Sequence, residues 1–229
     1  MEIGAGAGTL TVALAKTGAT VFAVEIDKRM EPILKERLLS FPNVKLIFED
    51  FLATDISFLP DNYKCVSNIP YYITAPILKK LIFTNFHSMS IMVQREVGER
   101  LLEQPGSSNR GFLTVVIQTI ADIEKLLLVP KSAFVPNPDI DSLVLKITKK
   151  SEFPFKTSQE LESYWKFVSN SFAQKRKTIQ NNLKNMISKH VIESALNSVG
   201  IEKSARPEEL TNEQFLNLWR YCYEKGLCL

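Results

Sequence analysis

The chain has 229 residues, 45% of them hydrophobic and 23% charged, and its 28 Lys and Arg against 25 Asp and Glu give a net charge of +3. This is the composition of a folded globular protein, which excludes disorder, collagen and coiled coil as descriptions of the whole chain. No apolar run approaches the ~20 residues of a membrane helix, and the first residues lack the basic and then apolar pattern of a signal peptide, so we expect no membrane contact.

Short apolar runs that suit buried strands alternate with amphipathic helix patterns over residues 1–150. We predict strands at residues 20–24, 44–48, 64–67, 90–93, 123–129 and 143–147, and helices at residues 28–39, 75–83, 96–103 and 112–121. The repeated order of strand, helix and strand indicates an α/β domain at residues 1–150, with a parallel sheet that is covered by helices on both faces.

The last third of the chain has helix patterns only. Residues 149–157 carry charges, Pro154 and no clear periodicity, which is typical of a linker. Helices are predicted at 158–172, 177–187, 191–199 and 213–224, the last one after helix-start residues at Thr211 and Asn212. We therefore expect a small helical domain at residues 151–229.

Cysteines and histidines are few and dispersed. Cys65, Cys222 and Cys228 are widely spaced and odd in number, which favours reduced thiols and a cytoplasmic location. His87 and His190 lie far apart in the sequence, so we do not expect a histidine-rich metal site.

A glycine-rich segment, Glu2-Ile3-Gly4-Ala5-Gly6-Ala7-Gly8, lies at the start of the sequence. Gly4, Gly6 and Gly8 let the backbone approach a ligand closely, and the helix that follows turns its first amides toward the loop. The spacing is neither the dinucleotide pattern G-x-G-x-x-G nor a P-loop with its Gly-Lys-Ser/Thr ending. The alternative interpretation is a tight strand-to-helix turn that binds no ligand.

Carboxylates follow the next two predicted strands. Glu25 ends the strand at 20–24, where an acidic residue would bind the two hydroxyls of a ribose, and Asp50 follows the strand at 44–48. Either residue alone could be a helix cap or a turn residue, but their joint position predicts a nucleoside-type site at one edge of the sheet. The spacing does not distinguish NAD from S-adenosylmethionine.

The segment Asn68-Ile69-Pro70-Tyr71 suits methylation of an exocyclic amine on a nucleobase. The amine of adenine is a weak nucleophile because its lone pair is delocalised into the ring. The side-chain oxygen of Asn68 and a neighbouring backbone carbonyl can accept hydrogen bonds from the amine and localise that lone pair, so alignment replaces a strong base. Pro70 stiffens the loop, and Tyr71 offers a ring face to an unstacked base. A strand-terminating turn is the alternative.

The proline-rich stretch at residues 130–141 carries a second aromatic candidate, Phe134. Pro130, Pro136 and Pro138 make this loop rigid and exposed, and an aromatic residue on such a loop is often functional. Phe134 could close the opposite face of the base, or it could be a core residue that anchors the loop.

In this order the motifs resemble the adenine dimethyltransferases of small-subunit ribosomal RNA (KsgA type), essentially from end to end. Besides the segments above, the matching segments are Val-Glu-Ile-Asp from Val24, Gln-Arg-Glu-Val from Gln94, Ala-Phe-Val-Pro from Ala133, Ser-Phe-Ala-Gln-Lys-Arg-Lys-Thr from Ser171 and Arg-Pro-Glu-Glu-Leu from Arg206. The resemblance implies an additional segment before the glycine loop that helps to cover the cofactor, and the sequence as given begins without it.

The resemblance implies a Rossmann-like methyltransferase that uses S-adenosylmethionine. Its implied substrate is two adjacent adenosines near the 3′ end of small-subunit rRNA, dimethylated on N6 during ribosome biogenesis. It implies that the cofactor is bound by Glu2, Gly4, Gly6, Gly8, Glu25, Ile26, Asp50, Phe51 and Asn68. In this set Glu2 supports the loop, Glu25 binds the ribose and Asp50 binds the adenine amine. Asn68, Ile69, Pro70 and Tyr71 form the catalytic loop, and Phe134 stacks on the target.

Basic residues in two regions are candidates for contact with the rRNA of an immature small subunit. They are Arg95, Arg100 and Arg110 near the end of the sheet domain, and Lys175, Arg176 and Lys177 at a predicted helix start. Contact with phosphates would make the binding salt-dependent. A solvated helix face is the alternative for such a charge run, and residues 175–177 could also face the domain interface. We expect a monomer.

Other functions remain as alternatives. The antibiotic-resistance methyltransferases of large-subunit rRNA share the sheet-domain motifs, but the segments at Lys175 and Arg206 argue against them. The loop at Asn68 disfavours a DNA adenine methyltransferase, and the glycine spacing disfavours an NAD dehydrogenase. A non-catalytic assembly factor that binds immature small subunits is the alternative from a different class.

Overall fold

The computed structural model describes residues 1–135 and 137–227, so the predictions on Pro136 and Cys228 lie outside the described residues. Contacts within the chain divide it into two compact units, which are described separately below. Unit 1 comprises residues 1–98 and 124–149, and unit 2 comprises residues 99–123 and the residues from 150 onward.

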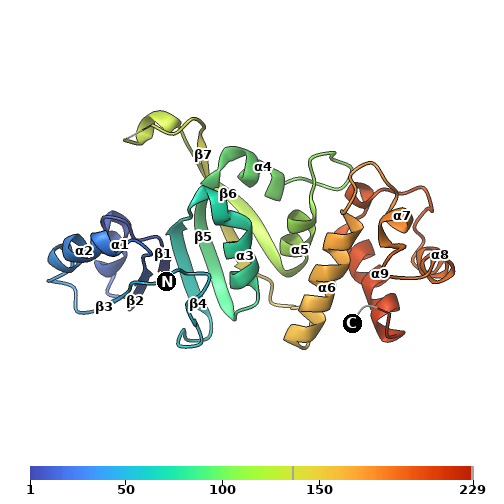
Figure 1. Ribbon diagram of the computed structural model, residues 1–229, viewed down its shortest axis with the longest axis horizontal. Coiled ribbons are helices and arrows are strands. Elements are labelled where there is room, and N and C mark those ends of the chain that lie inside the picture. Colours follow the sequence, from blue (N-terminus) through green and yellow to red (C-terminus); the bar gives the residue numbers. More distant parts are fainter. Residues whose placement is uncertain (136, 228–229) are drawn as a thin grey trace. The chain divides into compact units, whose positions relative to one another are not determined.

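Unit 1 is built on a β-sheet (Figure 1). Its strands are β1 (Glu2–Ile3), β2 (Val21–Val24), β3 (Val44–Ile47), β4 (Tyr63–Asn68), β5 (Phe86–Gln94), β6 (Ala121–Val129, whose first residues belong to unit 2) and β7 (Ser142–Lys149). They pair in two groups, β1-β2-β3 and β4-β5-β7-β6.

Hydrogen bonds between β1 and β4 connect these two groups. The Met1 ammonium donates to the carbonyl of Lys64 (2.7 Å), and the Val66 amide donates to the carbonyl of Met1 (2.9 Å). The Ser67 hydroxyl donates to the carbonyl of Ile3 (2.5 Å) and accepts from the Ile3 amide (3.2 Å). The combined strand order is therefore β3-β2-β1-β4-β5-β7-β6, in a Rossmann-like α/β arrangement as predicted.

One strand departs from the predicted parallel sheet. The pairs β1 with β2, β2 with β3 and β4 with β5 are parallel, whereas β7 runs antiparallel to β5. The cause lies in the connection from β6 to β7, because the described residues of the stretch 130–141 contain a short turn and no crossover helix. A parallel connection requires such a crossover.

The helices α1 (Thr9–Ala15), α2 (Glu31–Arg37), α3 (Thr74–Ile82) and α4 (Arg95–Leu101, which ends in unit 2) follow strands β1, β2, β4 and β5. In α3 the apolar residues Ile77, Leu78 and Leu81 recur at helical spacing, and all three are fully buried. The core strand β5 buries Met89 and Ile91 completely. The apolar residues of the predicted strands and helices thus form the core of unit 1.

Unit 2 is helical, with α5 (Phe112–Ile120), α6 (Ser158–Ser171), α7 (Ile179–Leu183), α8 (Lys189–Ser198) and α9 (Asn212–Glu224). The sequence predicts residues 99–123 in the sheet domain, whereas the contacts place them here. The reason is that α5 packs against α6 and α9. Val116 and Ile117 of α5 are fully buried, and the Thr119 hydroxyl lies 2.9 Å from the Tyr164 hydroxyl of α6.

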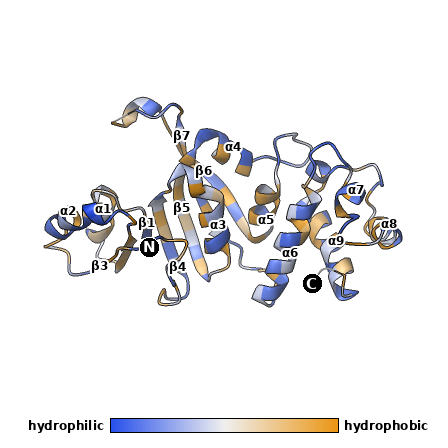
Figure 2. Cartoon of the chain, viewed as in Figure 1, coloured by the Kyte–Doolittle hydropathy of each residue, from blue (hydrophilic) through white to orange (hydrophobic). Residues whose placement is uncertain are grey.

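An aromatic cluster forms the centre of unit 2. The ring centroids of Phe155, Tyr164 and Trp219 lie 5.0 to 5.6 Å apart, and the Trp219 indole donates to the Ser163 hydroxyl (3.0 Å). Hydrophilic and hydrophobic residues alternate along α6 and α9, as expected for helices that bury one face (Figure 2). In the described part of the chain, no helix has the length and apolar character needed to cross a membrane.

Candidate functional site

The carboxyl ends of four neighbouring strands meet at one edge of the unit 1 sheet. Ile3 pairs with Val24, Val24 pairs with Ile47, and Ser67 is hydrogen-bonded to Ile3. The residues that follow these positions along the chain are Gly4, Glu25, Phe48 and Asn68. The strand registers therefore bring the predicted glycine loop, the first carboxylate and the Asn68 segment to the same edge.

The glycine loop takes a backbone conformation that requires glycine. Gly4, Gly6 and Gly8 have φ angles of +73°, +55° and +82°, and residues with a side chain rarely adopt these values. A Cβ at Gly4 would lie 3.7 Å from the Pro70 ring, so the loop passes next to the Asn68 segment. A Cβ at Gly8 would lie 2.8 Å from Leu34 Cδ2, whereas a Cβ at Gly6 would meet no atom within 4 Å. The backbone at Gly6 thus faces open space.

Glu25 ties the glycine loop to the end of β2. One carboxylate oxygen accepts from the Gly6 amide (2.7 Å) and the other from the Asp27 amide (2.8 Å). Glu25 itself is 7% exposed, whereas the next residue, Ile26, is 66% exposed. Because a carboxylate oxygen has two lone pairs, each oxygen retains the capacity to accept a hydrogen bond from a ligand hydroxyl.

Glu2 lies beneath this edge and is 1% exposed. Burial raises the pKa of its carboxyl group to about 7. One of its oxygens, Oε2, has no hydrogen-bond partner within the described chain. This burial fits a residue that supports the loop from β1.

The segment at Asp50 is held by Lys80, a residue that no sequence motif singles out. Asp50 is exposed, with Oδ1 accepting from the Leu52 amide (2.9 Å), whereas the Phe51 ring is buried. The Lys80 ammonium on α3 donates to the carbonyls of Phe51 (2.6 Å), Leu52 (3.1 Å) and Thr54 (2.5 Å). It also lies 4.9 Å from the centroid of the Phe51 ring. Lys80 therefore fixes the backbone that carries Asp50.

The Asn68 segment is anchored at alternate residues. Asn68 is exposed at the end of β4, and the buried Ile69 donates its amide to the carbonyl of Met92 (3.2 Å). The Tyr71 hydroxyl lies 2.5 Å from the Ser142 hydroxyl of β7, so this ring is tethered to the sheet. Tyr72, which the sequence analysis did not single out, is 99% exposed. Pro70 is also exposed.

The loop that carries Phe134 ends at the same edge, since Gln94 pairs with Ser142 and Met92 pairs with Asn68. Asp141 anchors this loop by accepting from the Lys131 amide (3.0 Å), and its Oδ2 lies 3.6 Å from Arg95 Nη1. Phe134 itself is half-buried. The ion pair gives Arg95 a structural role that the sequence analysis, which proposed contact with rRNA, did not foresee.

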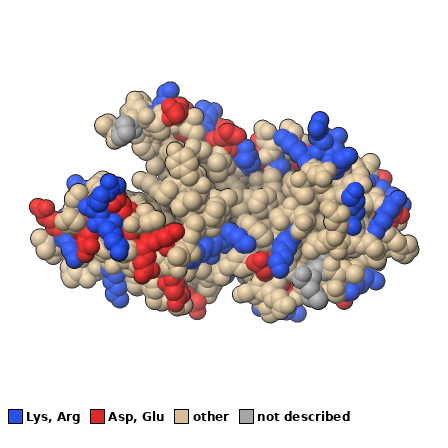
Figure 3. Space-filling view, in the orientation of Figure 1, with Lys and Arg blue, Asp and Glu red and all other residues tan. Residues whose placement is uncertain are grey.

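The remaining predicted rRNA contacts lie in unit 2. Arg100, on α4, is exposed, and so are Lys175, Arg176 and Lys177. The latter three occupy the turn between α6 and α7 and not the helix start that the sequence predicts, because α7 begins at Ile179. None of these three forms an ion pair with the residues that the structure describes. Lys and Arg side chains gather over the loops that precede α7 in unit 2 (Figure 3).

Arg110, in contrast, is buried and is not a surface contact. It is 3% exposed and donates to the carbonyl of Leu210 (2.5 Å) and to the side-chain oxygen of Asn212. This burial could not be predicted from the local sequence, because the neighbours of Arg110, Ser108 and Asn109, are typical loop residues.

The strand edge fits a nucleoside ligand with a short charged extension. The open space beside Gly6 leaves room at the loop, Glu25 offers hydroxyl acceptors, and the exposed Asp50 offers an acceptor to a base amine. These are the groups that S-adenosylmethionine requires, and the glycine loop among them passes next to the Asn68 segment at Gly4. The arrangement can therefore bring a methyl donor and a base amine together.

Comparison with protein families gives a match over residues 1–224 to the model described as "Ribosomal RNA adenine dimethylase". The chain is 49% identical over 228 residues to the ribosomal RNA small subunit methyltransferase A of Thermotoga petrophila. This match covers 98% of this chain and 82% of the relative. It is 36% identical over 241 residues to the protein of the same name in Levilactobacillus brevis, covering 99% and 81%.

Two solved structures are similar over nearly the whole chain. A dimethyladenosine transferase from Plasmodium falciparum has a TM-score of 0.79 and 27% identity, and the match covers 99% of this chain and 90% of that one. The 23S rRNA methyltransferase ErmE has a TM-score of 0.70 and 27% identity, with 96% and 88% covered. The fold is thus shared with an enzyme that is named for 23S rRNA, whereas the relative at 49% identity is named for the small subunit.

Proposed function

This chain belongs to the ribosomal RNA adenine dimethylase family, and from that premise we propose that the strand edge at Gly4, Glu25, Asp50 and Asn68 is its active site. The chain is an rRNA adenine dimethyltransferase that uses S-adenosylmethionine, and its substrate is small-subunit rRNA. The observation that carries the site is the register of β1, β2 and β4, which places the glycine loop beside the Asn68 segment.

We assign the cofactor to the residues of β1, β2 and β3. Gly4, Gly6 and Gly8 line the methionine part, and Glu25 accepts from the ribose hydroxyls while it holds the Gly6 amide. Asp50 accepts from the adenine amine. Of the two predicted ring contacts, Ile26 is the more exposed, and the buried Phe51 acts by packing beneath its own loop. When bound, S-adenosylmethionine supplies the methyl group from a sulfonium centre.

Asn68 prepares the target amine. Its side-chain oxygen and the carbonyl of Ile69 accept hydrogen bonds from the two N–H groups of the amine, which favours a tetrahedral nitrogen and localises its lone pair. With the cofactor bound, this nitrogen would take the methyl group from sulfur, S-adenosylhomocysteine would leave, and the nitrogen would release one proton to solvent. No side chain needs to act as a strong base, so alignment supplies most of the rate. Tyr72 and Phe134 offer ring surfaces to the adenine, while Tyr71 holds the loop through Ser142.

We propose that the substrate in the cell is an immature small subunit, that the targets are two adjacent adenosines near the 3′ end of its rRNA, and that the chain acts as a monomer in the cytoplasm. The exposed cations Arg100, Lys175, Arg176 and Lys177 of unit 2 support contact with RNA phosphates. Arg95 is assigned to the loop of Phe134 instead, through its ion pair with Asp141.

Asn68→Ala tests the assignment of the amine acceptor. The variant removes an exposed side chain whose loss leaves the fold intact, so it should bind small subunits like the parent, and kcat is measured at saturating S-adenosylmethionine. We expect kcat for methyl transfer to fall by 10² or more, in the range of losing one hydrogen-bond partner of a transition state. Tyr72→Ala serves as a comparison on the same loop and should affect KM for the subunit more than kcat. A parental kcat in Asn68→Ala would remove Asn68 from the mechanism.

A further inference from the structure

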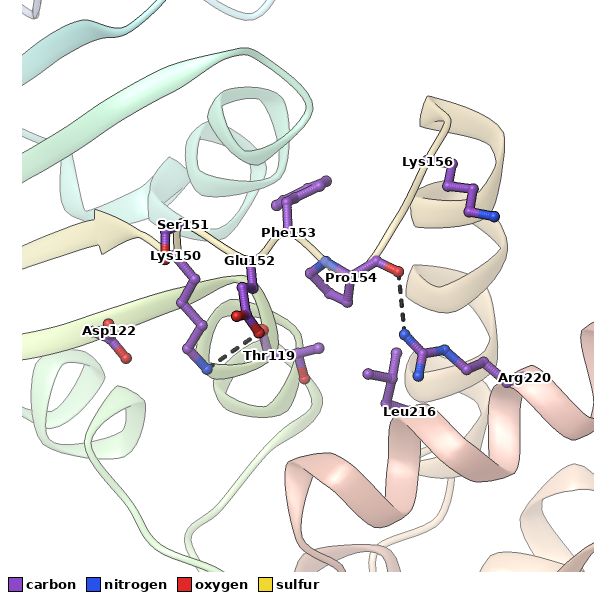
Figure 4. Close-up of a pocket in the computed structure, with 10 residues that line it drawn as sticks. All are labelled: Thr119, Asp122, Lys150, Ser151, Glu152, Phe153, Pro154, Lys156, Leu216 and Arg220. Atoms are coloured by element: carbon purple, nitrogen blue, oxygen red, sulfur yellow. Dashed lines mark hydrogen bonds between the residues drawn. The ribbon is translucent and has the colours of Figure 1, made fainter.

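Unit 2 contains hollows that the proposed active site does not use. One, of about 480 Å³, is lined by residues 197 and 200–204, with Glu202 and Lys203 as its charged residues. Another, of about 720 Å³, lies beside the segment at residues 150–156 and α9 (Figure 4). Its lining mixes Asp122 and Glu152 with Lys150, Lys156 and Arg220, so it favours neither sign of charge. A third hollow, of about 310 Å³, has a lining in which one sign of charge predominates. We call it the Arg110 cavity; its lining is Arg100, Ser108, Asn109, Arg110, Gly111, Phe112, Phe172, Lys175 and Glu208.

The charge of the Arg110 cavity favours an anion. Three of its lining residues are cations and only Glu208 is an anion. The buried Arg110 guanidinium is bonded to a carbonyl and an amide oxygen, its Nε has no partner, and no carboxylate pairs with it within the described chain. Burial lowers the pKa of Arg110 to about 10. Lys175 at the rim is exposed and forms no ion pair with the described residues. An anion would therefore reduce the cost of an unneutralised buried charge.

The same cavity presents two aromatic rings that their neighbours hold in place. Phe112 meets Trp165 edge to face, with centroids 5.3 Å apart, and Phe172 stacks on Phe215 at 5.8 Å. Both phenylalanines are half-buried and line the cavity. Rings fixed in this way form a platform for a flat, unstacked base, and the adjacent cations suit its phosphate.

We propose that the Arg110 cavity binds one unstacked nucleotide of the rRNA substrate, with its phosphate near Lys175 and Arg110 and its base against Phe112 or Phe172. This site differs from that of the target adenosine, which the residues of unit 1 hold. The inference rests on the proposed function for the identity of the RNA. A volume of about 310 Å³ matches the lower end of sites for small ligands, as a single nucleotide requires. Binding in the Arg110 cavity would give the chain a second contact with the rRNA, at an unstacked nucleotide other than the target adenosine.

The test is to fill the cavity by replacing an exposed residue of its lining with a larger one. Ser108→Trp places a large side chain in the cavity, and Ser204→Trp, at another exposed serine of unit 2 outside the cavity, is the matched control. The measurements are the Kd for protein-free small-subunit rRNA, the Kd for S-adenosylhomocysteine, and kcat and KM on small subunits without the modification. We expect Ser108→Trp to raise the rRNA Kd and the KM about tenfold, the scale of one lost stacking contact. Its kcat and cofactor Kd should match those of Ser204→Trp.

Lys175→Ala keeps the proposal testable if Ser108→Trp fails to fold. It should reduce the magnitude of the slope of log K against log salt for rRNA binding by about 0.7 to 0.9, the value for one phosphate, whereas Lys184→Ala outside the cavity should leave the slope unchanged.

Equal rRNA affinity in Ser108→Trp and Ser204→Trp, or an unchanged salt slope in Lys175→Ala, would overturn the proposal. A loss of binding to intact subunits but not to protein-free rRNA would also overturn it, because the occupant would then be a ribosomal protein. Weaker rRNA binding by Ser108→Trp in a preparation whose parent chain methylates no rRNA would support the cavity and refute the proposed function.

Discussion

Gly6→Ala should separate cofactor binding from folding at the glycine loop. Gly6 has a φ angle of +55°, and no heavy atom lies within 4 Å of the position that a Cβ would take. The fold therefore loses only the cost of a side chain in the left-handed conformation, about 1–2 kcal/mol. The new methyl group would enter the open space where the loop faces the proposed cofactor, so we expect the Kd for S-adenosylhomocysteine to rise at least tenfold.

Gly18→Ala is the matched control, because Gly18 has a φ angle of +80° and an equally open Cβ position, but it lies beyond the C-terminal end of α1. Urea unfolding should show the same loss of about 1–2 kcal/mol for both variants, whereas calorimetry should show weaker S-adenosylhomocysteine binding for Gly6→Ala alone. Gly8→Ala should unfold at lower urea than either, since its Cβ would lie 2.8 Å from Leu34 Cδ2. Equal S-adenosylhomocysteine affinity in Gly6→Ala and Gly18→Ala would refute the placement of the cofactor at this loop.

Two other variants test residues that act beneath the site. Burial raises the pKa of Glu2 from 4.5 to about 7, so the folded chain keeps a proton that the unfolded chain releases; stability should fall by up to ~3 kcal/mol as pH rises from about 4.5 to 7. Glu2→Gln should remove this fall in urea unfolding at pH 5 and pH 8, and a persistent fall would assign it to other groups. Lys80→Met leaves three loop carbonyls without their ammonium donor and should weaken S-adenosylhomocysteine binding about fivefold, with kcat at saturating cofactor unchanged. Lys35→Met removes only an exposed ion pair with Glu31 and should change neither S-adenosylhomocysteine binding nor kcat. A lower kcat in Lys80→Met without weaker S-adenosylhomocysteine binding would exclude a positioning role for Lys80.

Local signals in the sequence predicted the strand edge. The glycines at 4, 6 and 8 follow β1, Glu25 follows β2 and Asn68 ends β4, and the strand registers confirm that these ends lie together. This was predictable because the carboxyl ends of parallel strands share one edge of a sheet. The roles of the individual residues stay predictions until the variants are measured.

Other features depend on tertiary contacts that no local pattern carries. Lys80 has the sequence context of a solvated lysine on an amphipathic helix, yet it binds three carbonyls of a distant loop. The tether from Tyr71 to Ser142 joins residues 71 positions apart. Helix patterns showed that α5 is apolar, but not whether it packs with the sheet or with α6 and α9. The antiparallel direction of β7 likewise depends on the absence of a crossover α-helix among the described residues of the stretch 130–141, where the sequence predicts only a loop.

The most direct test of the account is methyl transfer from labelled S-adenosylmethionine to small subunits that lack the modification, with large subunits in a parallel reaction. Digestion of the rRNA to nucleosides should give labelled N6,N6-dimethyladenosine from the small subunit only. Label in large-subunit rRNA, or the absence of N6,N6-dimethyladenosine from small-subunit rRNA under conditions in which the chain binds S-adenosylhomocysteine, would contradict the account.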